Sequence, residues 1–133
     1  METQGTIRFM SKITLFLRAW GPSLLMMVTI FCFSSITSNG MPNFGSLDFL
    51  VKKGGHATGY ALLALANLHA LGWDRKRWWL AWLIATLYSA TDEFHQSLVP
   101  GRSPALMDVG IDAFGAAGGL LLWGWVKRAE NRE

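Results

Sequence analysis

The segment TDEFHQSLVPGRSPALMDVGID, residues 91–112, carries the side chains most capable of chemistry. Glu93 could act as a general base with His56 as its acid or base partner, since positioned carboxylates and imidazoles transfer protons. Oxygen-rich sites also suit Mg²⁺ or Mn²⁺. A divalent cation is therefore a candidate cofactor, and its candidate ligands are four acids, Asp92, Glu93, Asp108 and Asp112.

The catalytic signal is weak. The sequence has no HExxH, nucleophile-elbow or C-x-x-C motif. On a helix, Glu93 and His95 would lie about 200° apart, which is a poor geometry for chelating one metal. Cys32 is a single cysteine with no disulfide or metal-ligand spacing. An enzyme acting on a lipid-linked phosphate substrate through an acid/His or divalent-metal site is kept as an alternative.

Two cations in the same region could bind an anionic group. Arg102 directly follows a Pro-Gly pair, and a turn beside a helix end is a good way to present the planar guanidinium fork to a phosphate. Lys53 could add a second charge-assisted contact. The interpretation that competes with ligand binding is that these charges pair with the acids and hold helices in register.

The surroundings of these charges are apolar. Of 133 residues, 51% are hydrophobic and only 16% charged, against about 25% charged in soluble averages. A short soluble helical domain has too little polar surface to cover so much apolar residue. The composition therefore predicts an all-α membrane protein, and strands are not expected because no alternating period occurs. The net charge of +3 comes from basic clusters at segment ends, so a nucleic-acid partner is not expected.

Four segments are long enough to cross about 30 Å of hydrocarbon. They are residues 19–36, 55–72, 78–97 and 105–126. The first could instead be a cleaved signal peptide, because basic residues precede it and small residues follow it. Against that, its apolar run is longer than usual and no A-x-A site closes it. We expect four transmembrane helices in a membrane domain over 19–126.

Lys and Arg predict the orientation of this bundle. Nine flank the spans on one side and three on the other, so the positive-inside rule places both termini in the cytoplasm. Residues 1–18 and 127–133 are then cytoplasmic, and all seven Trp lie near cytoplasmic span ends. The predicted location is the cytoplasmic (inner) membrane, crossed several times, with the bilayer as the main partner and a homo-oligomer left open.

This topology gathers the polar residues in one outer layer. Helical spacing puts residues three or four apart on one face. The second span then contributes Lys53, His56 and Tyr60, the third Asp92, Glu93 and Gln96, and the fourth Asp108 and Asp112, with Gly115 and Gly119 behind them. We expect a paired charge cluster there and a close helix approach at the two glycines. Because burying acids in a membrane is costly, the cluster is a candidate functional site.

The ordered residues of this cluster resemble the VanZ-like membrane family. The resemblance covers about residues 50–120 and is carried by Lys53-x-x-His56-x-x-x-Tyr60 and by the string DExxQxxxPGR from Asp92 to Arg102, followed by Asp108. The chain departs from the family at Ala57, where an aromatic is usual, and at Asp112, where Asn is usual. The added acid bears on ligand preference.

The resemblance implies a small multispan bacterial membrane protein. The founding member is associated with reduced susceptibility to the glycopeptide antibiotic teicoplanin, and resistance is not transferred to this chain. The preferred hypothesis is that the protein binds or acts on a cell-envelope amphiphile, either a lipid-linked intermediate or a glycopeptide-type antibiotic. The alternatives are the enzyme above and a structural or accessory membrane subunit. Ligand-binding candidates are Lys53, Tyr60, Asp92, Gln96, Arg102, Asp108 and Asp112.

Overall fold

The computed structural model describes residues 2–132, and these residues form four long helices with no strand among them. The helices are α1 (Glu2–Ser34), α2 (Asp48–Ala70), α3 (Trp78–Gln96) and α4 (Leu106–Glu130). Short 3-10 turns at Ser38–Gly40, Gly45–Leu47 and Arg75–Arg77 lie in the connections. The all-helical prediction is confirmed, and each of the four predicted spans overlaps one helix.

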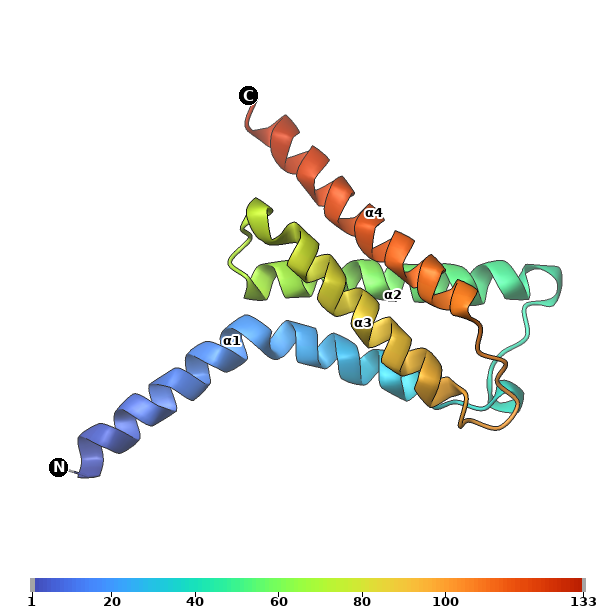
Figure 1. Ribbon diagram of the computed structural model, residues 1–133, viewed down its shortest axis with the longest axis horizontal. Helices are drawn as coiled ribbons and strands as arrows, with labels where there is room; N and C mark the ends of the chain where they lie inside the picture. Colours follow the sequence, from blue (N-terminus) through green and yellow to red (C-terminus); the bar gives the residue numbers. More distant parts are fainter. Residues whose placement is uncertain (1, 133) are drawn as a thin grey trace.

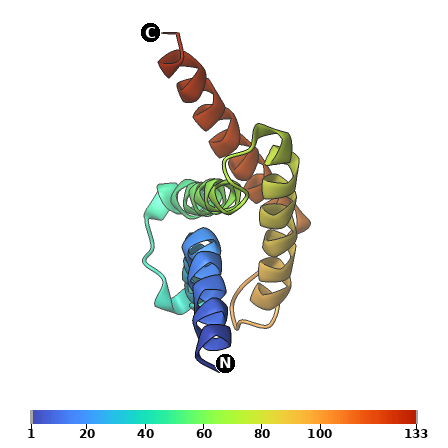
Figure 2. The ribbon, with the colours of Figure 1, turned by 90° about the vertical axis from the view of Figure 1, so that its left-hand side faces the viewer.

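Helix α2 is the centre of the bundle, because its contacts with the other three helices are the most extensive. Figure 1 shows α4 crossing over α2 and diverging from it toward the C-terminus, while the second half of α1 runs beside α2 and α3. The view in Figure 2 shows the ends of α1 and α2 side by side, with α3 flanking them. The core is built from small and aliphatic residues, including Leu63, Ala64, Ala81, Ala85 and Ala116.

Helix α1 is longer than expected. It has 33 residues, about 50 Å at 1.5 Å per residue, which exceeds a hydrocarbon core of about 30 Å. Figure 1 shows that α1 bends and that its first half leaves the bundle. Pro22 lies inside the helix, and a proline removes one backbone bond and clashes with the preceding turn. Residues 2–18 of the predicted cytoplasmic segment thus belong to the first helix.

Only two of the four helices are apolar and long enough, by length and composition, to be candidate membrane spans. In the described part of the chain they are Arg8–Ser34 and Leu106–Glu130. Helix α2 contains Lys52, Lys53 and His56, and α3 ends with Asp92 and Glu93. These polar residues lower the mean hydropathy because both helices build the polar interior of the bundle. The prediction of four helices is confirmed, whereas hydropathy supports two spans.

Helices α2 and α4 approach closely where both carry small residues. A Cβ added to Gly115 would lie 2.7 Å from Ala57 Cα, and one added to Gly119 would lie 2.9 Å from Ala61 Cβ. Ala57 and Ala61 repeat at the same four-residue spacing as the two glycines, so small faces meet along one helix side. The predicted close approach at Gly115 and Gly119 is confirmed.

Candidate functional site

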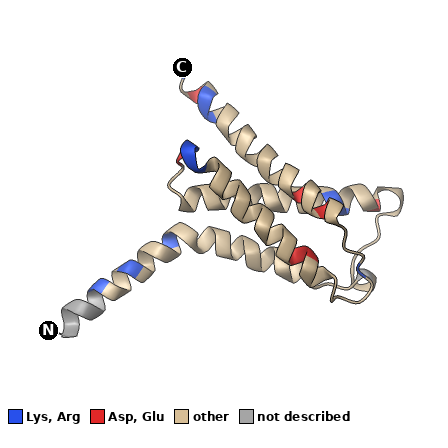
Figure 3. Ribbon diagram, in the orientation of Figure 1, with Lys and Arg blue, Asp and Glu red and all other residues tan. Residues whose placement is uncertain are grey.

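The polar residues gather at one end of the bundle. This polar end comprises the C-terminal ends of α1 and α3 and the N-terminal ends of α2 and α4. Figure 3 shows acidic residues there, while most of the described Lys and Arg residues lie toward the end that holds the two termini. Near the latter end, the Trp123 ring stacks on that of Trp73 at a centroid distance of 5.0 Å and meets that of Trp78 edge-to-face at 5.9 Å. The structure therefore separates acidic and basic residues as the topology prediction requires.

Asp92 lies in a buried hydrogen-bond network between α1 and α3. Ser34 Oγ donates to Asp92 Oδ2 at 2.6 Å, and Gln96 Nε2 donates to the same oxygen at 3.0 Å. The Gln96 amide lies one turn after Asp92 on α3, as the sequence spacing predicts. Asp92 is only 3% exposed, and its other oxygen, Oδ1, has no hydrogen-bond partner among the described residues.

Asp112 connects α4 to α2 and α3. Ser89 Oγ donates to Asp112 Oδ2 at 2.7 Å, and His56 Nδ1 lies 3.7 Å from Asp112 Oδ1. Asp112 is 1% exposed, and no described group is within hydrogen-bond distance of its Oδ1. The acid at the position where the VanZ-like pattern usually has Asn is therefore fully inside the bundle, and the histidine of the motif faces it.

Lys53 forms an ion pair with Asp108, which joins the N-terminal ends of α2 and α4. The expected paired cluster is thus present for Lys53 with Asp108 and for His56 with Asp112. Lys52, one residue earlier, pairs within α2 with Asp48 at 2.8 Å. Lys52 and Lys53 thus each neutralise the charge of a nearby carboxylate.

The Lys53–Asp108 pair is expected to contribute little to stability. Its side chains are 29% and 13% exposed, and partly exposed ion pairs contribute about 0–1 kcal/mol. Lys53→Met should therefore lower the free energy of unfolding by about 1 kcal/mol, measured by thermal unfolding of the detergent-solubilised protein. Lys52→Met, which breaks a pair within one helix, is the matched control. A loss above about 3 kcal/mol for Lys53→Met, as for a buried pair, would contradict this reading.

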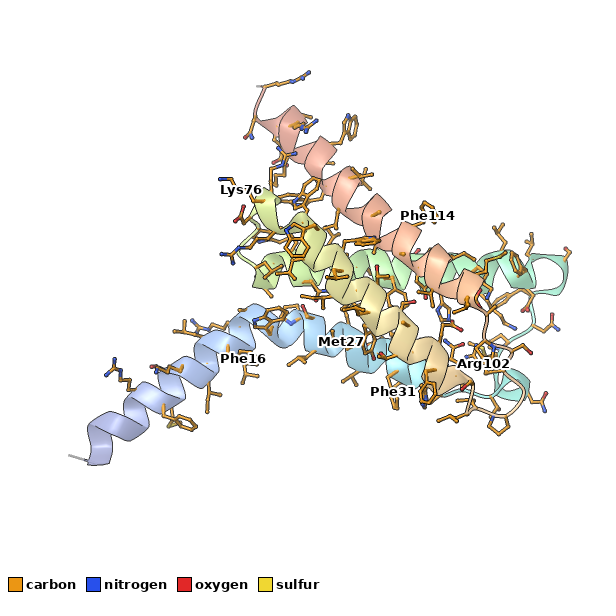
Figure 4. The ribbon with its side chains drawn as sticks, in the orientation of Figure 1. Phe16, Met27, Phe31, Lys76, Arg102 and Phe114 are labelled. Atoms are coloured by element: carbon orange, nitrogen blue, oxygen red, sulfur yellow. The ribbon has the colours of Figure 1, made fainter. Side chains whose placement is uncertain are left out.

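Arg102 contacts main-chain carbonyls and not an acid. Its Nε donates to Ile36 O at 3.0 Å and its Nη2 to Phe33 O at 3.0 Å. Figure 4 shows Arg102 beside the C-terminal end of α1. A helix C-terminus has unpaired carbonyls and a partial negative charge, both of which favour a guanidinium. The sequence predicted that Arg102 would contact an anionic ligand or the acidic cluster, whereas its described contacts are with α1.

The Pro-Gly pair places Arg102 as the sequence predicted. Arg102 N donates to Val99 O at 3.2 Å, which closes a turn with Pro100 and Gly101 at its centre. Gly101 has φ +77°, the left-handed conformation that the third residue of a type II turn requires. The local turn chemistry thus fixes the backbone, and the long Arg side chain then spans the distance to α1.

Glu93 and His56 line different cavities. Glu93 borders a cavity of about 320 Å³ beside Pro104, Ala105 and Leu106, while His56 borders a larger one between α1 and α2. Glu93 is 8% exposed, its Oε1 accepts a 3.5 Å contact from Gln96, and its Oε2 has no hydrogen-bond partner among the described residues. The proton-transfer pairing of Glu93 with His56 stays a prediction.

The four acids proposed as ligands of a divalent cation are not brought together. In residues 2–132, no three side chains of His, Cys, Asp or Glu are arranged so that they could hold a metal ion. The reason is visible in their partners, because Asp108 is engaged by Lys53 and Asp92 by Ser34 and Gln96. The residues present do not fit the suggested cation site.

The larger cavity has a volume of about 530 Å³ and lies between α1 and α2, beneath the connection that contains Met41, Pro42 and Phe44. Most of its lining is apolar and includes Met26, Ile30, Phe33, Val51 and Leu62. Its polar lining residues are Thr29, Ser34, Lys52, His56, Thr58 and Tyr60. The volume is within the range of about 300–1,000 Å³ typical of ligand pockets, as is the combination of apolar walls with a few polar groups.

Tyr60 is the polar group most distinctive of this cavity. It is 1% exposed, and its hydroxyl has no hydrogen-bond partner among the described residues. Its ring lies between those of His56 and Tyr88, at centroid distances of 6.5 Å and 6.4 Å. Burying a hydroxyl without a partner is costly, and the Ser89 side chain lies beside this hydroxyl without forming a hydrogen bond of normal length. Tyr60 is therefore a candidate to bond a molecule in the cavity.

Sequence reasoning missed several residues of this site. Ser34 and Ser89 satisfy the two buried acids, and the 41–44 segment covers the cavity. Ser34 gave a signal, because it is a hydroxyl at the outer end of an apolar span, at the depth expected for Asp92. The 41–44 segment gave none, since its place over the cavity depends on how α1 and α2 pack.

The VanZ/LLP1 family profile matches residues 19–127, which include α2, α3, the second half of α1, most of α4 and the entire polar end. The chain belongs to the VanZ/LLP1 family. This confirms the resemblance seen in the sequence and extends it to α1, which the motif residues did not cover. No significant match is found among curated proteins or among solved structures.

Proposed function

We propose that this VanZ/LLP1 protein is a four-span inner-membrane protein that binds a cell-envelope amphiphile from the outer face of the membrane. One observation carries the proposal: a largely apolar cavity of about 530 Å³ whose polar lining includes Ser34, Lys52, His56 and Tyr60. An amphiphile has matching apolar and polar parts: its hydrocarbon chain would contact the apolar walls, and its head would contact the polar groups.

The membrane part of the proposal is supported by side chains on the outside of the bundle. Large apolar residues are exposed along the outer helices, and among them Phe114 on α4 is 82% exposed and Leu25 on α1 is 67% exposed. Figure 4 shows Phe114 on the outer side of α4. Exposed apolar surface of this extent is stable in lipid and unfavourable in water. The basic residues near both termini favour a cytoplasmic location for that end.

The direction of access follows from this orientation. With the basic end in the cytoplasm, the polar end lies at the outer surface, and the cavity opens between the outer halves of α1 and α2. A lipid-linked intermediate or another envelope amphiphile in the outer leaflet could then enter sideways from the bilayer. The head would meet the residues that the family motif and the structure share, His56 and Tyr60.

Filling the cavity is expected to prevent binding. A Cβ added to Gly55, which lines the cavity, would meet no described atom within 4 Å. Gly55→Leu can therefore project into the cavity without a backbone clash, and we expect at least a tenfold loss of co-purified lipid, about 1.4 kcal/mol. The measurement is native mass spectrometry of the full chain, extracted from membranes in mild detergent.

Gly118→Leu is the matched control. Gly118 lies on α4, is exposed and has equally open space around its Cβ position, but it is outside the cavity. It should retain the wild-type lipid content. If Gly55→Leu also retains it while remaining folded, the cavity is not a lipid site, and the accessory role of a braced helix bundle becomes the better explanation of the polar end.

A further inference from the structure

Three buried polar atoms at the polar end of the bundle, close to the cavity, lack hydrogen-bond partners within residues 2–132. Among the described residues, Tyr60 Oη, Asp92 Oδ1 and Asp112 Oδ1 are all buried without a hydrogen-bond partner. Each is connected to the cavity lining: Tyr60 borders it directly, Asp92 is bonded to the lining residue Ser34, and Asp112 faces the lining residue His56. A molecule bound in the cavity would meet Tyr60 directly, with the unpartnered oxygens of Asp92 and Asp112 one residue behind the lining.

These atoms specify what the head must offer. A carboxylate oxygen only accepts hydrogen bonds, whereas a phenol both donates and accepts. A phosphate head offers acceptors and would leave Asp92 and Asp112 without donors. An ammonium offers donors only and would leave the Tyr60 hydrogen without an acceptor. Hydroxyl groups satisfy both requirements, because each can donate to a carboxylate and accept from the phenol.

The charges around the cavity disfavour an anionic head for a second reason. Lys52 and His56 line the cavity, but Lys52 is paired with Asp48, and His56 Nδ1 lies 3.7 Å from Asp112 Oδ1. Lys53 is paired with Asp108, and Arg102 donates to main-chain carbonyls. Bringing a phosphate next to Asp92 and Asp112 would place like charges together in a site of low dielectric constant. An uncharged head avoids this repulsion.

We infer that the ligand of this cavity is an amphiphile with an uncharged, hydroxyl-rich head such as a sugar, recognised by Tyr60, Asp92 and Asp112. The inference rests on the proposed function and deepens it by naming the class of head. It replaces the phosphate contact by Lys53 and Arg102 that the sequence suggested.

The test compares two lipids that share their acyl chains. The full-length protein, reconstituted in phosphatidylcholine nanodiscs, is titrated with monoglucosyl dioleoylglycerol and with dioleoyl phosphatidic acid, and bound lipid is counted by native mass spectrometry. The glucosyl lipid should bind at least tenfold more tightly. Tyr60→Phe should weaken its binding about five- to tenfold, as expected for one lost hydrogen bond.

Tyr88→Phe is the matched control, since the Tyr88 hydroxyl already donates to Met27 O at 2.7 Å and does not line the cavity. It should change glucosyl lipid binding less than twofold. Asp112→Asn is the second variant and should also weaken that binding, with folding checked by elution profile and melting temperature.

If phosphatidic acid binds as tightly as the glucosyl lipid, or Tyr60→Phe binds normally, the inference on the head is overturned while lipid binding stands. If neither lipid binds in competition with phosphatidylcholine, and Gly55→Leu loses no co-purified lipid, the proposed function fails as well.

Discussion

Gly115→Ala is expected to destabilise the protein by about 3 kcal/mol, at the upper end of typical overpacking costs. The added Cβ would lie 2.7 Å from Ala57 Cα and 2.8 Å from Ala57 C. These are main-chain atoms of α2, so the clash cannot be relieved by rotating a side chain. The helices α2 and α4 would have to separate, and the residues that α4 presents to the polar end would move with them.

Three alanine variants grade this effect. Gly118→Ala adds the same methyl where no described atom lies within 4 Å, and it should stabilise by up to about 1 kcal/mol through helix propensity. Gly119→Ala should fall between the two, because its Cβ would meet Ala61 Cβ at 2.9 Å and Ala61 O at 3.0 Å. Melting temperature and monodisperse yield in detergent report the order. Equal stability of Gly115→Ala and Gly118→Ala would refute the close approach.

Arg102→Met is expected to lower the free energy of unfolding by about 2 kcal/mol. It removes two hydrogen bonds, to Ile36 O and Phe33 O, both at 3.0 Å. Hydrogen bonds to charged groups contribute about 1.5–3 kcal/mol each when shielded, and partial exposure of this guanidinium reduces that value. The readout is denaturant or thermal unfolding, with Arg102→Lys beside it. A lysine keeps the charge but lacks the fork, so it should restore less than half of the loss.

The same variants distinguish a structural role from ligand contact. If Arg102 fastens the 97–105 connection to the end of α1, the folded fraction of Arg102→Met should bind glucosyl lipid and phosphatidic acid as the wild type does. A variant that keeps its stability but loses phosphatidic acid binding would instead support the anion contact predicted from the sequence. Stability and binding are thus measured separately for one residue.

The polar end also explains how buried acids are tolerated in this small bundle. Asp92 and Asp112 each receive one short hydrogen bond from a serine on another helix, at 2.6 Å and 2.7 Å. Each also retains one oxygen without a described partner. If all four carboxylate oxygens had hydrogen-bond partners, the two acids would be explained by a structural role alone. Half satisfaction beside a cavity is the arrangement expected where a ligand completes the network.

The sequence by itself determined the helices, the Pro100-Gly101 turn and the family. Helices and turns depend on residues within about four positions of each other, so apolar runs and turn residues predict them. It also determined that Gly115 and Gly119 share a face, because helical periodicity is local. Two features still departed from four equal spans. Helix α1 is longer and contains Pro22, and the charged residues of α2 and α3 lower the hydropathy of these helices.

Only the tertiary structure decided which polar groups meet. Ser34 and Asp92 are 58 residues apart, and Arg102 and Phe33 are 69 apart, so neither contact leaves a periodic trace in the sequence. The choice of carbonyl groups as partners for Arg102, and the isolation of the Tyr60 hydroxyl, follow from how α1 packs on α2 and α3. Helix packing decides whether a buried polar group has a partner, because the possible partners lie on other helices. No local sequence pattern records which of those helices comes close.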